Sequence, residues 1–181
     1  MLRPFRGVEP QIDPSAFVAE TAVIIGDVTI GPQSSIWYNV VVRGDVNSIR
    51  IGARTNIQDL SILHVSHAGG PDDPGAPLVV GDDVTVGHNV TLHGCTICSG
   101  AFVGMQAVVM DHVVVGEGAL VGARALVTEG TAIPPHTLWI GAPAKYKRDL
   151  TPAEREKLAK SPQNYVQYAQ QYIAEPAGRC D

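Results

Sequence analysis

Three of the six histidines stand where they could share a metal ion. His64 and His93 each directly follow a leucine, and His88 lies two residues after a valine. Neutral imidazole nitrogens are common zinc ligands, and three histidines with an open fourth position describe a catalytic zinc site. The three histidines therefore predict a metal centre, provided that the fold brings them together.

A six-residue repeat of apolar positions is the element that must position these histidines. Six differs from the period of two in a strand and from 3.6 in a helix, so a long run of it predicts a hexapeptide β-helix. Insertions break the frame at 43–50 and 64–78, and in a solenoid such insertions form loops on one face. The repeated positions are Ile12, Val18, Ile24, Ile30, Ile36, Val42, Ile51, Ile57, Leu63, Val80, Val86, Leu92, Ile97, Val103, Val109, Val115, Val121, Val127 and Ile133.

Two segments are expected from these patterns. Residues 1–149 form the hexapeptide β-helix domain, and residues 150–181 form a C-terminal helical segment packed on it. Thr151-Pro152-Ala153-Glu154 carries the signature of a helix start, because threonine caps, proline suits the first helical position and glutamate completes a capping box. The sequence thus predicts an all-β repeat domain followed by α-helix.

The C-terminal segment should contain a break. The first helix is expected to run to about Lys160, and Ser161-Pro162 should start a second one, because proline is favoured at a helix start and disfavoured inside a helix. Three tyrosines then fall on one face of this second helix, and we expect that face to pack on the outside of the β-helix. They are Tyr165, Tyr168 and Tyr172.

The repeat places two of the histidines side by side. With three hexapeptides per coil, Leu63 and Leu92 fall in one column of the triangular cross-section and Val86 falls in the preceding column. His64 and His93 then occupy the same position one coil apart, where strands are about 4.8 Å apart. Two nitrogens on one tetrahedral zinc lie roughly 3.3 Å apart, so this stacked pair can bind one ion.

The third histidine lies around a corner of the same coil. The five residues from His88 to His93 span roughly 16 Å when extended, so His88 cannot easily join the pair of its own chain. It can join the pair of a neighbouring subunit if the two columns meet. A ring of three subunits closes this arrangement, and the spacing predicts a homotrimer with a metal site at each interface.

Composition excludes several classes of function. The chain has 181 residues, a net charge of −5 and no basic run, which argues against nucleic acid and against an anionic membrane surface. No signal peptide and no apolar run of membrane-spanning length is visible, so we expect a cytoplasmic protein.

The cysteines, Cys95, Cys98 and Cys180, imply no disulfide framework, and one C-x-x-C without a second pair is a weak metal signal.

Several short motifs resemble the γ-class carbonic anhydrase family, within the hexapeptide-repeat superfamily. The resemblance covers about residues 1–175, and the combined set is far more specific than the repeat, which acyltransferases share. The motifs are Arg43-Gly44-Asp45, Asn56-Ile57-Gln58-Asp59, Leu63-His64, Val86-Gly87-His88, Leu92-His93-Gly94-Cys95 and Ile140-Gly141-Ala142-Pro143-Ala144-Lys145.

The resemblance implies a left-handed parallel β-helix that forms a homotrimer with Zn²⁺, or alternatively Fe²⁺, at each interface. By this likeness His64, His88 and His93 bind the metal. Arg43 and Asp45 form an ion pair near the site, which could equally be a structural contact between subunits. The same motifs imply catalytic roles for Gln58, which would hold the metal-bound water, and for Asp59.

The expected activity is the hydration of carbon dioxide to bicarbonate, with proton export as a weak point. The archetypal archaeal enzyme of the family has a glutamate where this chain has Val46, and it has a proton-shuttling glutamate in an acidic loop. The loop after His64 offers His67, Asp72 and Asp73 instead. Three alternatives stay open: an acyl-CoA thioesterase using the same metal-bound hydroxide, a non-catalytic trimeric metal-binding scaffold, and a hexapeptide acyltransferase.

Overall fold

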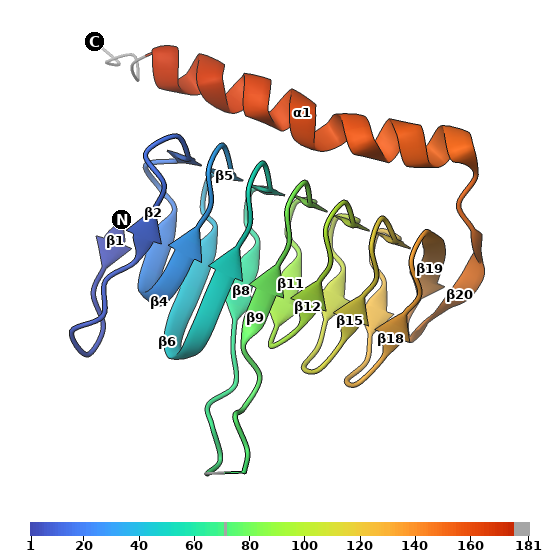
Figure 1. The fold of residues 1–181 in the computed structure, drawn as a ribbon, viewed down its shortest axis with the longest axis horizontal. Coiled ribbons are helices and arrows are strands. Elements are labelled where there is room, and N and C mark those ends of the chain that lie inside the picture. The colour runs from blue at the N-terminus through green and yellow to red at the C-terminus, as the bar shows by residue number, and fades with distance from the viewer. Residues whose placement is uncertain (71, 176–181) are drawn as a thin grey trace.

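Short strands wind into a parallel β-solenoid whose coils stack along one axis, and a single long helix lies along it (Figure 1). This computed structural model describes residues 1–70 and 72–175. The prediction of a hexapeptide β-helix with a C-terminal α-helix is confirmed. Residues 65–70 and 72–77 belong to a loop, called the loop 65–77 below, which projects from the coils between β8 (Ile62–His64) and β9 (Leu78–Val80) (Figure 1).

The solenoid has three faces, which we call the a, b and c faces. The b face is an eight-stranded sheet, parallel except where its last strand turns back. Its strands are β3 (Phe17–Val18), β5 (Ser35–Ile36), β7 (Asn56–Ile57), β10 (Thr85–Val86), β13 (Phe102–Val103), β16 (Leu120–Val121), β19 (Thr137–Gly141) and β20 (Ala144–Asp149).

The a and c faces join into one 12-stranded sheet, because two long strands pass through both of them. These are β4 (Val23–Ile30) and β6 (Val41–Ile51), and β1 (Leu2–Arg3) pairs with β4. The other strands of the c face are β8 (Ile62–His64), β11 (Thr91–His93), β14 (Val108–Val109) and β17 (Leu126–Val127). The other strands of the a face are β2 (Gln11–Ile12), β9 (Leu78–Val80), β12 (Thr96–Ile97), β15 (Val114–Val115) and β18 (Ala132–Ile133).

The core is the narrow interior of the solenoid, and the repeated apolar residues fill it. On the b face Ile36 pairs with Ile57, which in turn pairs with Val86. On the c face Leu63 pairs with Leu92, and all five side chains are fully buried. Because every coil presents the same column to the next, burial of these side chains fixes the register of the whole stack.

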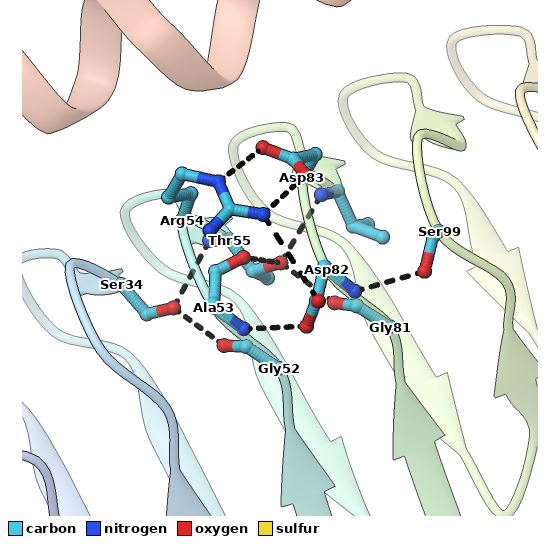
Figure 2. A network of polar contacts seen from close by, with 10 residues as sticks. Ser34, Gly52, Ala53, Arg54, Thr55, Gly81, Asp82, Asp83 and Ser99 are labelled. Atoms are coloured by element: carbon cyan, nitrogen blue, oxygen red, sulfur yellow. Dashed lines mark hydrogen bonds and ion pairs between the residues drawn. The ribbon is translucent and has the colours of Figure 1, made fainter.

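Polar side chains bond one coil to the next at the corner between the a and b faces (Figure 2). The Ser34 hydroxyl accepts a bond from the amide of Thr55 at 3.0 Å, and the Thr55 hydroxyl accepts one from the amide of Val84 at 3.1 Å. Arg54 adds a bidentate ion pair with Asp83, with both N···O distances 2.7 Å. These hydroxyl groups give hydrogen-bond partners to backbone amides at the corner, where the ladder between strands is interrupted.

The C-terminal segment is one continuous helix, α1 (Pro152–Ala174), and the predicted break at Ser161-Pro162 is wrong. Pro162 lies inside α1 and is buried. It costs the helix a backbone hydrogen bond, but its ring is buried on the side that faces the solenoid, so packing offsets the loss. Figure 1 shows α1 running back along the stack toward the first coils. In the described part of the chain, no helix combines the length and apolar character needed to cross a membrane.

Aromatic packing anchors the C-terminal half of α1 to the outside of the first coils. The ring of Tyr172 lies edge-on to Trp37 at 5.3 Å between centroids and contacts Phe17 at 5.6 Å. Tyr165 lies edge-on to Trp37 at 5.5 Å, whereas Tyr168 is exposed and contacts Tyr165. The prediction that this tyrosine face packs on the β-helix is thus confirmed for Tyr165 and Tyr172.

We expect the start of α1 to be sensitive to acid through Glu154. Hydrogen bonds from Arg148 and Thr151 hold the pKa of this carboxyl at about 2, below its ordinary value of 4.5. A lowered pKa in the folded state means that these contacts stabilise the helix above pH 4.5, and that this stabilisation is lost as the pH falls toward 2. Circular dichroism at 222 nm should show acid-induced fraying that is absent in Glu154→Gln. Glu156→Gln is the matched control and should fray like the parent; identical acid curves for all three proteins would contradict the assignment.

Candidate metal centre

Two imidazole rings meet on the c face at the ends of adjacent strands. His64 ends β8 and His93 ends β11, and the two residues are paired partners in the ladder. Nδ1 of His64 lies 3.0 Å from Nε2 of His93. This separation is close to the roughly 3.3 Å expected for two nitrogens on one tetrahedral zinc ion. In-register stacking therefore brings together the two histidines that share a column.

Each of these rings has a carboxylate on its other nitrogen. Nε2 of His64 lies 3.2 Å from Oδ1 of Asp45, and Nδ1 of His93 lies 2.5 Å from Oδ1 of Asp111. A neutral imidazole that donates its one N–H to a carboxylate has a bare nitrogen on the opposite side. The two facing nitrogens are then both bare, and their lone pairs repel unless a cation lies between them. The two bare nitrogens fit a divalent metal ion. Histidines whose other ring nitrogen donates to a carboxylate are typical of metal sites.

The third histidine has the same arrangement on a different face. His88 lies two residues beyond β10 on the b face, and its Nδ1 is 2.8 Å from Oδ2 of Asp59. Half of its side chain is exposed. Within residues 1–70 and 72–175, no group of three or more His, Cys, Asp or Glu is arranged to hold a metal ion. The chain therefore offers a pair of histidines and a separate third one.

Arg43 and Asp45 form an ion pair beside the histidine pair, with Nη1 and Oδ2 2.6 Å apart. Burial raises the pKa of Asp45, but hydrogen bonds from Arg43 and His64 outweigh it and hold the pKa below its ordinary value. Burial lowers the pKa of His64, and the Asp45 carboxylate only partly compensates. His64 is thus held neutral, which is the form that binds metals.

Gln58 donates the first bond in a series of side-chain hydrogen bonds that the sequence did not reveal. Its Nε2 donates to Oδ1 of Asn56 at 3.0 Å, and Nδ2 of Asn56 donates to Oγ1 of Thr85 at 2.9 Å. Thr85 in turn donates to Oγ of Ser161 in α1 at 3.0 Å. This series of bonds links Gln58 to α1 and engages one of the two N–H groups on its Nε2. The carboxamide oxygen has no bond among those found in the described residues.

Asp111 is a further site residue that sequence reasoning missed. It stands two residues after Val109, the same offset from a column residue that Asp59 and His88 have. That shared offset was the available signal.

A surface cavity of about 310 Å³ adjoins the Asp59 side of the site, lined by Trp37, Tyr38, Asp59, Tyr165, Tyr168 and Tyr172.

The remaining candidates lie outside this arrangement. Cys95 is buried, and burial raises the pKa of its thiol well above the ordinary value, so it is held in the unreactive form. Cys98 is partly exposed, and both thiols are free; Cys180 lies outside the described residues. His67 is exposed in the loop 65–77, and Oδ1 of Asp73 accepts a bond from the amide of Gly75.

The fold and this site define a hexapeptide-repeat protein with histidine–carboxylate pairs on two faces. The family model described as bacterial transferase hexapeptide (six repeats) matches residues 94–129. Protein YrdA of Escherichia coli (strain K12) is 47% identical over 173 residues, which is 96% of this chain and 94% of that protein. A carbonic anhydrase of Geobacillus kaustophilus is 45% identical over 174 residues, covering 96% of this chain and 92% of the relative.

A solved structure agrees with these sequence matches. The crystal structure of a hexapeptide transferase family protein from Anaplasma phagocytophilum superimposes with a TM-score of 0.87 at 44% identity, over 94% of this chain and 97% of the other. Gamma carbonic anhydrase 2 of Arabidopsis thaliana is 46% identical over 166 residues, which is 92% of this chain and 59% of that protein. The chain belongs to the γ-class carbonic anhydrase family of hexapeptide-repeat proteins. The resemblance inferred from the sequence motifs is thereby confirmed.

Metal should stabilise the protein through the paired histidines. A zinc concentration a hundredfold above Kd stabilises a folded protein by about 2.7 kcal/mol, which corresponds to a rise of roughly 5–10 °C in Tm for a chain of this size. We expect this rise in the parent on zinc addition and its reversal by a chelator, measured by differential scanning fluorimetry. His64→Ala should lose the response. His136→Ala, which alters a histidine at the corner after β18, should keep it, and an equal loss in both variants would rule out a specific pair.

Proposed function

We propose that this protein is a metal-dependent hydro-lyase of the γ-carbonic anhydrase type, which hydrates carbon dioxide to bicarbonate with release of a proton. The observation that carries the proposal is the pair of facing imidazole nitrogens, 3.0 Å apart, on rings backed by Asp45 and Asp111. Identity of 45% to a relative named carbonic anhydrase supports the reaction class. Zn²⁺ is the proposed metal, with Fe²⁺ as the alternative.

The proposed site is shared between subunits of a homotrimer. His64 and His93 on the c face of one subunit meet His88 on the b face of the next. Ile62 of β8 and Val108 of β14 are exposed apolar residues of the c face, one on each side of Thr91 of β11. A contact between subunits at this face would bury both side chains. Three such contacts close a ring with three equivalent sites.

We assign a separate role around the metal to each of the polar residues that contact the three histidines or lie near them. The bound metal would supply hydroxide at neutral pH by acidifying a water. Asp45, Asp59 and Asp111 hold the three rings with one nitrogen free for the metal. Gln58, fixed through Asn56, presents its carboxamide oxygen as an acceptor that orients the attacking oxygen. Arg43 keeps Asp45 charged and aligned.

A second candidate function is cleavage of an acyl-CoA thioester at the same metal. The observation that favours it is a cavity of about 750 Å³ beside α1, whose lining includes Phe102, Leu120, Tyr165 and Tyr168 but none of the three histidines. Carbon dioxide needs no such volume, whereas an acyl chain would bury apolar surface there. A non-catalytic trimeric scaffold is the outcome if neither substrate reacts.

Mixed trimers test the shared site. His88→Ala and His93→Ala should each abolish metal binding and activity. When the two variants are refolded together, an interface that joins the c face of the first to the b face of the second receives all three histidines. Metal content and activity should therefore recover in the mixture. A mixture no better than either parent variant would place all ligands within one chain.

Proton export should limit the rate of carbon dioxide hydration. The chain has Val46 in place of a glutamate, and its nearby loop offers His67, Asp72 and Asp73. In stopped-flow assays, imidazole buffer should raise kcat and leave kcat/KM unchanged. His67→Ala should lower kcat at low buffer and be rescued by imidazole if His67 is the shuttle. Fully metal-loaded protein without activity at any buffer concentration would contradict the proposal, and a panel of acyl-CoA esters would then separate a thioesterase from a scaffold.

A further inference from the structure

Asp111 connects three segments that are distant in the sequence. It lies two residues beyond β14, and its Oδ1 is 2.5 Å from Nδ1 of His93 at the end of β11. Its Oδ2 accepts a bond of 2.6 Å from the hydroxyl of Ser66, at the base of the loop 65–77. Both carboxylate oxygens are therefore engaged, and the carboxylate has a single orientation between the histidine and the loop.

The glycine after His93 makes room for this carboxylate. Gly94 has a φ of +50°, and a Cβ at this position would lie 2.5 Å from Oδ1 of Asp111 and 2.5 Å from Cβ of Ala76. The carbonyl of Gly94 also accepts a bond from the amide of His112 at 2.8 Å, which holds the two successive corners together. Glycine is thus required beside His93 because any side chain would displace Asp111.

The Ser66 end of the contact is fixed as well. Ser66 and Ala76 exchange backbone hydrogen bonds of 3.1 and 3.2 Å across the base of the loop. Nδ2 of Asn47 donates to the carbonyl of Ser66 at 3.0 Å and to that of Pro74 at 2.9 Å. The loop base therefore holds the Ser66 hydroxyl against Asp111.

We propose that Asp111 is a positioning residue, which holds His93 with its proton on Nδ1 and its bare Nε2 toward His64, while Ser66 locks the carboxylate in place. An imidazole that is free to change tautomer would carry its proton on Nε2 part of the time and could not then bind a metal through that nitrogen. The expected effect on metal affinity rests on the function proposed above. The expected tautomer of His93 is independent of that function.

Cobalt(II) affinity, measured by competition with a chelator, tests the metal consequence. Asp111→Ala should weaken binding by about 10–100-fold, the usual cost of removing a carboxylate behind a metal-binding histidine. Ser66→Ala keeps the contact to His93 and should cost less than Asp111→Ala. Glu117→Gln is the matched control, because Glu117 also lies two residues beyond a strand, β15, and it should bind like the parent. Unchanged affinity in Asp111→Ala would overturn the proposal.

Imidazole ¹⁵N NMR of the metal-free protein tests the tautomer directly. The parent should show His93 with Nδ1 protonated, identified by comparison with His93→Gln, and Asp111→Ala should populate the Nε2-protonated form. Asp111→Asn keeps the shape without the charge, so it serves if the alanine variant fails to fold. A parent that binds no cobalt would refute the proposed function but leave this experiment informative. The same tautomer in parent and Asp111 variants would refute the positioning role.

Discussion

In-register stacking of the coils is the constraint on which the rest of this structure depends. Each six-residue step buries one repeated apolar side chain and commonly a second residue two positions before it, as in Ala101 and Val103. Adjacent coils therefore cannot slip without exposing whole columns. Ile57 between Ile36 and Val86 is one example. The same stacking aligns the residues outside the core, because a fixed offset from a buried residue becomes a fixed place on a face. Sequence spacing is thereby converted into spatial distance.

The interior of such a solenoid leaves no space for chemistry, so the functional groups must lie on the faces and corners. His64 and His93 follow buried leucines and point outward from the c face, and His88 stands beyond the b face. Each ring contacts a carboxylate, Asp45 and Asp59 coming from the preceding coil and Asp111 from the following one. The three histidines are thus divided between two faces of one chain, and the homotrimer proposed above is the arrangement that would bring them together.

The helix α1 contributes to the site as well as to stability. Its tyrosines pack on Trp37 and Phe17 at the first coils, and Ser161 ends the hydrogen-bond chain that starts at Gln58. The position of Gln58 therefore depends on how the helix lies against the b face. Pro162 is tolerated inside α1 because its ring is buried in that contact.

The sequence by itself determined the repeat, the columns and the stacking of His64 on His93, because these follow from a period that every coil repeats. It also separated His88 from that pair, since a corner lies between them. The tertiary structure alone decided that Asp111 reaches back to His93, that Asn56 and Ser161 hold Gln58, and that α1 continues through Pro162. These features depend on side-chain directions and on the packing of one helix against one face. Neither is periodic. Spacing could place Asp111 two residues after the buried Val109, but it could not show that the carboxylate contacts His93.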